Sequence, residues 1–84
     1  MHSEDIQKFM LTHKMAVGKH LKITFKKRDP IFGIIVHAHD AADLEPKNFW
    51  RIVSLPNIKD WQSSNNLNFS RIFNGQEFVK LTVQ

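Results

Sequence analysis

The dipeptide Asn74-Gly75, near the C-terminus of this 84-residue chain, limits the possible folds more than any other feature. Runs of aromatic and β-branched residues flank it, over residues 68–73 and 76–83. Asn-Gly is the strongest short-range hairpin signal, because both central positions of a type I′ turn need a positive φ. We therefore predict that the chain ends in a tight β-hairpin, which carries no catalytic signature.

The N-terminal segment has the pattern of one short helix. Ser3 is the expected N-cap, and Glu4 and Asp5 place negative charge in the first turn, where the helix dipole favours it. The spacing of a helix then places four residues on one face, namely Ile6, Phe9, Met10 and His13. Gly18 is the expected C-terminal stop, and we predict a helix over residues 3–15.

Beyond residue 19 the apolar residues recur at every second position, as in a strand. Leu21, Ile23 and Phe25 alternate with polar residues, which predicts a half-buried strand. Residues 31–36 are apolar on both faces, which predicts a strand buried on both sides. Gly33 within this run predicts a sharp bend or a bulge.

The remaining segments complete the expected architecture. Residues 37–48 form a connection, residues 48–53 predict a third strand, and residues 54–67 are a polar insertion that Ile58 and Trp61 anchor. One helix followed by about five short strands predicts a mainly β fold, a small barrel closed by strong bending of its strands. The barrel is expected over residues 19–84, within a single domain that spans residues 1–84.

Several function classes lack the residues that they need. The chain has no cysteine, the serines have no recognisable base partner, and the three glycines are isolated, so no nucleophile or phosphate-loop motif can be assembled. We predict that the protein is not an enzyme and that it has no catalytic residue and no cofactor. The longest apolar run is far shorter than a membrane span of about 20 residues, and the first residues do not resemble a signal peptide. A soluble cytoplasmic protein without a membrane partner is expected.

Positive charge is concentrated in the first third of the chain. The net charge is +4, which divides into +5 over residues 1–28 and −1 over residues 29–84. The candidate basic face consists of Lys19, Lys22, Lys26, Lys27 and Arg28. Such a face attracts polyanions, and the alternative is a strand face that is charged only for solubility.

His37 and His39 are the only cluster that resembles a metal site. On a strand they would project from the same face, and Asp40 and Asp43 follow closely. Imidazole and carboxylate groups can ligate a divalent metal. No third histidine shares the motif, so we expect no metal site and interpret these residues as polar groups at a strand end.

Three segments resemble the Sm-like (LSm) family of small RNA-binding barrels. Residues 22–26 resemble the family's first strand, residues 31–35 its first motif and residues 71–79 its second motif. The likeness covers nearly the whole chain as a pattern. It implies an N-terminal helix, five strongly bent strands in an open barrel, and homo-oligomeric rings of six or seven subunits. The fourth strand of one subunit would pair with the fifth strand of the next.

By position, the resemblance also implies a candidate RNA-binding rim. Its residues are His39, Asp40, Asn48, Arg71, Asn74 and Gly75. The family's Asp stands six positions after the second-strand Gly, where this chain has His39, and Asp40 follows one position later. The family's Arg-Gly pair corresponds to Asn74-Gly75.

Aromatic side chains are candidate stacking platforms for unpaired bases. They are Phe32, Phe49, Trp50, Phe73 and Trp61, of which Trp61 is the expected exposed ring. Core packing is the alternative role for each of them.

The terminal strand bears on the expected assembly. In it Val79, Leu81 and Val83 alternate with Phe78, Lys80 and Thr82. Head-to-tail ring closure would remove the unprotected edge of this strand, and coverage by the helix or the insertion is the alternative.

The sequence therefore predicts a non-enzymatic, ring-forming Sm-like protein with single-stranded RNA as its candidate ligand. Two alternatives remain open. One is an SH3-like protein-interaction module that holds a peptide with its aromatic residues. The other is a structural subunit that oligomerises without binding RNA.

Overall fold

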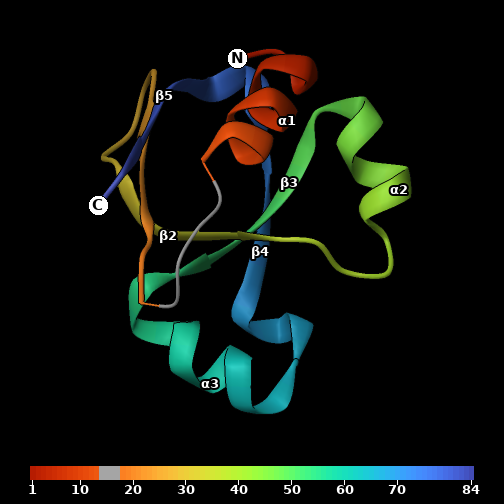
Figure 1. Cartoon of the computed structure of the whole chain (residues 1–84), viewed down its shortest axis with the longest axis vertical. Coiled ribbons are helices and arrows are strands. Elements are labelled where there is room, and N and C mark those ends of the chain that lie inside the picture. The colour runs from red at the N-terminus through yellow and green to blue at the C-terminus, as the bar shows by residue number, and fades with distance from the viewer. Residues whose placement is uncertain (14–17) are drawn as a thin grey trace.

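Five antiparallel strands form one sheet in the computed structural model, which describes residues 1–13 and 18–84 (Figure 1). The strands are β1 (Leu21–Phe25), β2 (Ile31–Val36), β3 (Phe49–Ser54), β4 (Ser70–Asn74) and β5 (Phe78–Val83). Their order in the sheet is β4-β3-β2-β1-β5. The predicted N-terminal helix and the five strands that follow it are confirmed. Consecutive strands β4 and β5 lie at opposite edges of the sheet.

Helices add more to the fold than the sequence pattern indicates. The α-helices are α1 (Ser3–Thr12), α2 (Ala41–Leu44) and α3 (Ile58–Ser64). Short 3-10 segments are η1 (Glu45–Lys47), η2 (Leu55–Asn57), η3 (Leu67–Phe69) and η4 (Gly75–Glu77). The fold is therefore mixed α and β rather than mainly β. Helices α2 and α3 were not predicted, because elements of one or two turns contain too few positions to show helical periodicity. Among the described residues, no helix has the length and apolar character that crossing a bilayer requires.

The predicted ends of the first helix need correction. His2, not Ser3, is the N-cap of α1, with an extended backbone at φ −79° and ψ 156°. The Ser3 hydroxyl instead donates a hydrogen bond to the Glu45 carbonyl oxygen at 2.8 Å, which ties α1 to η1. The helix ends at Thr12, so Gly18, at φ +87°, does not cap it. Residues 14 and 15 of the predicted helix lie outside the described residues.

The hydrophobic core lies between α1 and the sheet. Leu21 and Ile23 are fully buried and Phe25 nearly so, which confirms the predicted alternation in β1. Ile6, from α1, is also fully buried, and Phe9 and Met10 pack partly against the same cluster. Strands β3 and β5 complete it with Trp50, Ile52, Phe78 and Leu81. Each fully buried aliphatic side chain stabilises the fold by about 1.5–3 kcal/mol.

Gly33 is where β2 exchanges one neighbour for another. Residues 31–33 of β2 pair with β1, and residues 33–36 pair with β3. A Cβ atom at Gly33 would overlap the backbone carbonyl oxygen of Val53. The register of β2 is regular at this position, so the glycine allows a close approach of β3 rather than a bulge.

Strand β2 is not buried on both faces as predicted. Phe32 keeps 39% of its surface exposed and pairs with Lys22, whose Nζ lies 5.9 Å from the centre of the phenyl ring. This face of β2 therefore stays partly open to solvent at Phe32. A run of apolar residues cannot reveal which of its faces remains open.

The sheet curves strongly enough to bring separated strands together. Phe25 of β1 and Phe73 of β4 lie 5.6 Å apart between ring centres, although β2 and β3 stand between these strands in the sheet. Phe25 also packs edge-on against Phe78 of β5 at 5.2 Å. Rings from β1, β4 and β5 are therefore in contact with one another through Phe25.

The predicted terminal hairpin is wrong. In the described part of the chain β4 pairs with β3 and β5 pairs with β1, and these strands do not pair with each other. Asn74 has φ −80°, and its side chain accepts a hydrogen bond from the Gln76 backbone N–H at 2.9 Å. This Asx-type turn opens η4. The local preference of Asn-Gly for a type I′ turn is overridden because Phe78 packs in the core beside β1.

Candidate functional site

Asn48 is a buried polar residue that joins three segments. It lies just before β3 in the left-handed region, at φ 65°, and keeps 9% of its surface exposed. Its Nδ2 donates to the Met1 carbonyl oxygen at 2.8 Å, and its Oδ1 accepts from the Trp50 indole N–H at 2.8 Å. A carbonyl only accepts and an indole N–H only donates, which fixes the orientation of the amide. Both ends of the predicted base-binding amide are therefore occupied inside the fold.

Gly75 lies directly against Asn48. The Gly75 N–H donates to the Asn48 carbonyl oxygen at 2.7 Å. A Cβ atom at Gly75 would overlap the Asn48 Oδ1 and lie 2.7 Å from the Ile6 Cδ1. The Met1 ammonium donates to the carbonyl oxygens of Gly75 and Phe78 at 2.9 and 2.8 Å. Three of the predicted rim residues, Asn48, Asn74 and Gly75, are thus brought together.

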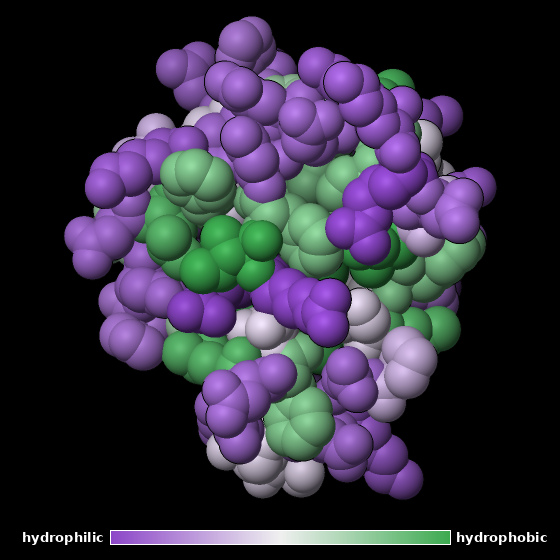
Figure 2. All heavy atoms as spheres, turned by 180° about the vertical axis from the view of Figure 1, so that it is seen from behind, coloured by the Kyte–Doolittle hydropathy of each residue, from purple (hydrophilic) through white to green (hydrophobic). Residues whose placement is uncertain are grey.

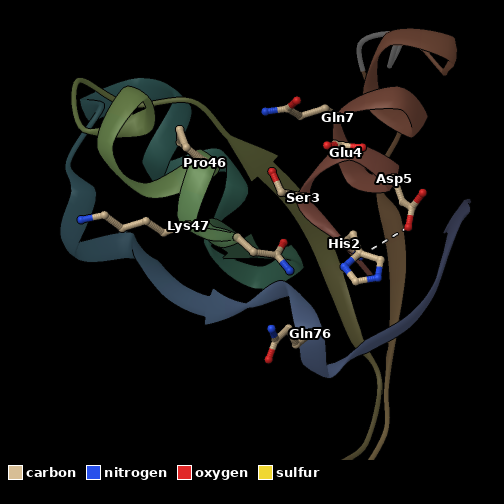
Figure 3. A pocket seen from close by; sticks show the side chains of 9 residues that line it. His2, Ser3, Glu4, Asp5, Gln7, Pro46, Lys47 and Gln76 are labelled. Carbon is tan, nitrogen blue, oxygen red and sulfur yellow. Dashed lines mark hydrogen bonds between the residues drawn. The ribbon is translucent and has the colours of Figure 1, made fainter.

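A polar depression of about 680 Å³ lies beside this cluster (Figure 3). The start of α1, η1 and Gln76 of η4 border it. Its lining residues are His2, Ser3, Glu4, Asp5, Gln7, Pro46, Lys47, Asn48 and Gln76. A smaller hollow of about 250 Å³ is lined by Met1, His2, Lys26 and Gln76, so His2 and Gln76 border both. Amide, hydroxyl and imidazole groups suit hydrogen bonding to a polar heterocycle, whereas Glu4 and Asp5 disfavour a phosphate here.

Asp40 lies in a separate ion pair. Arg51 Nε donates to Asp40 Oδ1 at 3.0 Å and Arg51 Nη2 donates to Oδ2 at 2.6 Å. Arg51 Nη1 also donates to the Ser70 hydroxyl at 3.0 Å. Because neighbouring strand residues point to opposite faces, Arg51 lies on the face opposite Trp50. Hydrogen bonding by Arg51 lowers the pKa of Asp40 and, reciprocally, raises the pKa of Arg51. Through Arg51, Asp40 joins the start of α2 to β3 and β4, and its predicted place in an RNA-binding rim stays a prediction.

Asp40→Asn is expected to lower the melting temperature at neutral pH and to leave it nearly unchanged near pH 2. Arg51 lowers the folded-state pKa of Asp40, so the ion pair stabilises the fold above the unfolded carboxyl pKa of about 3.9. That stabilisation disappears as the pH falls through the lower, folded-state pKa. Melting curves across this range test the expectation, with Asp60→Asn, which removes an exposed carboxylate of α3, as the matched control. A full-sized difference at pH 2 would contradict it.

His37 and His39 do not form the strand-end pair that their spacing predicts. Both residues follow the end of β2, and both are exposed. His37 Nδ1 and Glu45 Oε2 lie 2.5 Å apart, whereas His39 lies in the turn before α2. Over the described residues, no three His, Cys, Asp or Glu side chains are placed to hold a metal ion.

Four of the five residues of the predicted basic face are exposed, Lys22 is half-buried, and part of the face adjoins the residues around Asn48. Lys22 projects outward from β1, between buried neighbours, and Lys19 is exposed before it. Lys26, Lys27 and Arg28 are exposed in the turn between β1 and β2. The Lys26 N–H donates to the Glu77 carbonyl oxygen at 3.0 Å, which joins this turn to η4. The remaining rim residue, Arg71, is exposed on the edge strand β4.

The aromatic residues divide into core and surface groups. Trp50 keeps 1% of its surface exposed and packs in the core, so it is not a stacking platform. Trp61 is half-buried, and its enclosed indole N–H has no partner among the described residues. Phe32 and Phe49 are the more exposed rings, at 39% and 36%. Phe73 is half-buried against the core.

The two edge strands carry exposed apolar side chains. Ile72 of β4 is 45% exposed, and Val79 and Val83 of β5 are 56% and 38% exposed. Thr24 pairs with Lys80 whereas Phe25 pairs with Phe78, so Val79 is the extra residue of a bulge and turns outward. This bulge breaks the alternation expected along the last strand. Figure 2 shows apolar surface across the middle of one face, interrupted there by hydrophilic side chains and bordered by more of them.

Two features of the candidate site were not predicted from the sequence. Gln76 and His2 border both depressions, and no motif singles out either residue. Arg51 positions Asp40 from another element, so only the fold reveals the pair. No family model, curated protein or solved structure matches this chain.

Proposed function

We propose that this chain is a non-enzymatic, Sm-like ring subunit that binds single-stranded RNA. The observation that carries the proposal is the strand order, which places β4 and β5 at the two open edges of the sheet. Each edge strand has exposed apolar side chains, including Ile72 and Val79. The edges of one subunit can therefore pair with those of its neighbours.

The curvature of the sheet supports the small-barrel part of the proposal. Phe25 contacts both Phe73 and Phe78, so rings from β1, β4 and β5 meet over the core. Strand β2 exchanges partners at Gly33. These are the features expected of a short sheet that closes into an open barrel by bending its strands.

Pairing between β4 of one subunit and β5 of the next is a head-to-tail contact. Such contacts form a closed ring when the rotation per subunit closes, and closure leaves no open edge. By resemblance, the ring contains six or seven subunits. An unprotected apolar edge strand is otherwise an aggregation hazard. Pairing of the edge strands within an assembly would remove this hazard.

The ligand part of the proposal is supported by what surrounds Asn74 and Gly75. Gln76 and His2 offer hydrogen-bonding groups to a base at the polar depression. The exposed cations of the β1–β2 turn lie next to η4, where Lys26 contacts Glu77. Polar groups for a base beside cations for a phosphate are the combination that single-stranded RNA binding uses.

A short fluorescein-labelled oligouridylate tests the RNA proposal by anisotropy. We expect binding at low salt that weakens steadily as salt rises, because phosphate contacts release counterions. Lys26→Gln should reduce the log–log salt slope by about 0.7, the value for one single-strand phosphate contact. Lys59→Gln, which removes the same charge from α3, is the matched control and should leave the slope unchanged. An absence of binding at low salt would contradict the proposal.

An SH3-like interaction module is the alternative proposal. The exposed rings of Phe32 and Phe49 favour it, because aromatic side chains line the grooves that hold extended peptides. A monomeric chain that binds no RNA would make this alternative the better one.

A further inference from the structure

Arg28 is held over two aromatic rings. It lies in the turn between β1 and β2, and its guanidinium carbon is 5.3 Å from the ring centre of Phe25 and 5.3 Å from that of Phe73. The two rings are themselves in contact, at 5.6 Å, and Phe25 is buried. The aromatic platform beneath the guanidinium is thus part of the core, so it restricts an otherwise flexible side chain.

The donors of this guanidinium are not used within the fold. Over residues 1–13 and 18–84 the structure contains no ion pair and no side-chain hydrogen bond that involves Arg28. Contact with the rings leaves five N–H donors in the guanidinium plane. Arg51, by comparison, donates from all three of its nitrogen atoms, to Asp40 and Ser70. A fixed guanidinium with free donors is preorganised for an anion that accepts two parallel hydrogen bonds, such as a phosphate.

The residues around Arg28 indicate the direction in which a polyanion bound there would extend over the surface. Lys26 and Lys27 precede Arg28 in the same turn, and Lys26 lines the hollow that Gln76 also borders. The acidic residues Asp29 and Glu77 lie close by, so net charge here is small. Long-range electrostatic attraction between this turn and a polyanion is therefore weak. An anion site here depends mainly on the fixed geometry of the Arg28 guanidinium.

We propose that Arg28, held on Phe25 and Phe73, is a specific phosphate contact for single-stranded RNA. This inference rests on the RNA binding proposed above and adds which residue fixes the backbone. An RNA chain that contacts Arg28 can continue past Lys26 towards Gln76, where a base meets the polar hollow.

The Arg28→Lys variant distinguishes the effect of a fixed guanidinium on RNA affinity from the effect of positive charge alone. The same oligouridylate titration is expected to show binding weakened about fivefold to tenfold, because lysine cannot form the bidentate contact. Phe73→Leu leaves Arg28 charged but removes one ring, and a similar loss is expected. Lys59→Arg, an exchange between the same two residue types on α3, is the matched control and should bind like the wild type. Melting curves of all variants establish that they are folded.

The outcomes separate this inference from the proposal beneath it. Wild-type protein that binds the oligouridylate while Arg28→Lys binds equally well would overturn the role of Arg28 and leave RNA binding standing. Wild-type protein that does not bind would overturn both. Equal weakening by Arg28→Lys and Lys59→Arg would also overturn the specific contact, because the loss would then not depend on a guanidinium at position 28.

Discussion

The Ile72→Lys, Val79→Lys double variant is expected to be a folded monomer with a mass near 9.8 kDa. Both side chains are exposed on the outermost strands, at 45% and 56%, so their removal leaves the core unchanged. Lysine on an edge strand opposes pairing with another chain because its charge would have to be desolvated. Light scattering behind a sizing column measures the mass, and circular dichroism reports whether the fold remains.

Leu11→Lys is the matched control for the edge variant. Leu11 is 77% exposed on α1, so this change replaces an exposed apolar side chain away from both edges. The control is expected to keep the mass of the wild-type assembly. A double variant that also keeps this mass would show that β4 and β5 do not form the contact between subunits.

Asn48→Gly is expected to lower the melting temperature by about 10 °C. The change retains the left-handed backbone but leaves the buried Trp50 N–H unpaired, which costs about 1–3 kcal/mol, and each kcal/mol is about 4–8 °C for a domain of this size. It also removes the donor to the Met1 carbonyl oxygen. Asn48→Ala should be less stable still, because alanine adds about 1 kcal/mol of strain in the left-handed region.

A double-mutant cycle with Trp50→Phe isolates the hydrogen bond between the two side chains. Phenylalanine removes the indole donor, so the two changes together should cost less than the sum of the single changes. Thermal melts of the four proteins supply the coupling, which is expected between about 0.5 and 3 kcal/mol. Asn48→Gly with a wild-type melting temperature would contradict the structural role of Asn48.

The elements that could be predicted from the sequence are those in which buried residues recur at a regular, short spacing along the chain. Strand β1 follows from the alternation of Leu21, Ile23 and Phe25, and the apolar stripe of α1 follows from Ile6 and its helical neighbours. The terminal hairpin could not be predicted correctly. Asn74-Gly75 has a strong local turn preference, but β4 and β5 each gain a partner that is distant in sequence.

The candidate site was predictable only in part, because it depends on contacts between distant residues. The resemblance placed Asn48 near Gly75, and a hydrogen bond of 2.7 Å joins them. No pattern in the sequence around Asn48 indicates that its side-chain amide forms hydrogen bonds with Met1 and Trp50. The pairing of Asp40 with Arg51 and the position of Arg28 over Phe73 likewise require the curved sheet.

The mass of the wild-type chain in solution is the most direct test of the proposed ring. Multi-angle light scattering behind a sizing column is expected to give about 60–70 kDa, which corresponds to six or seven copies of the 9.8 kDa chain. That result would support pairing between the open edges of neighbouring subunits. A single species at 9.8 kDa would contradict the ring and favour a monomeric interaction module.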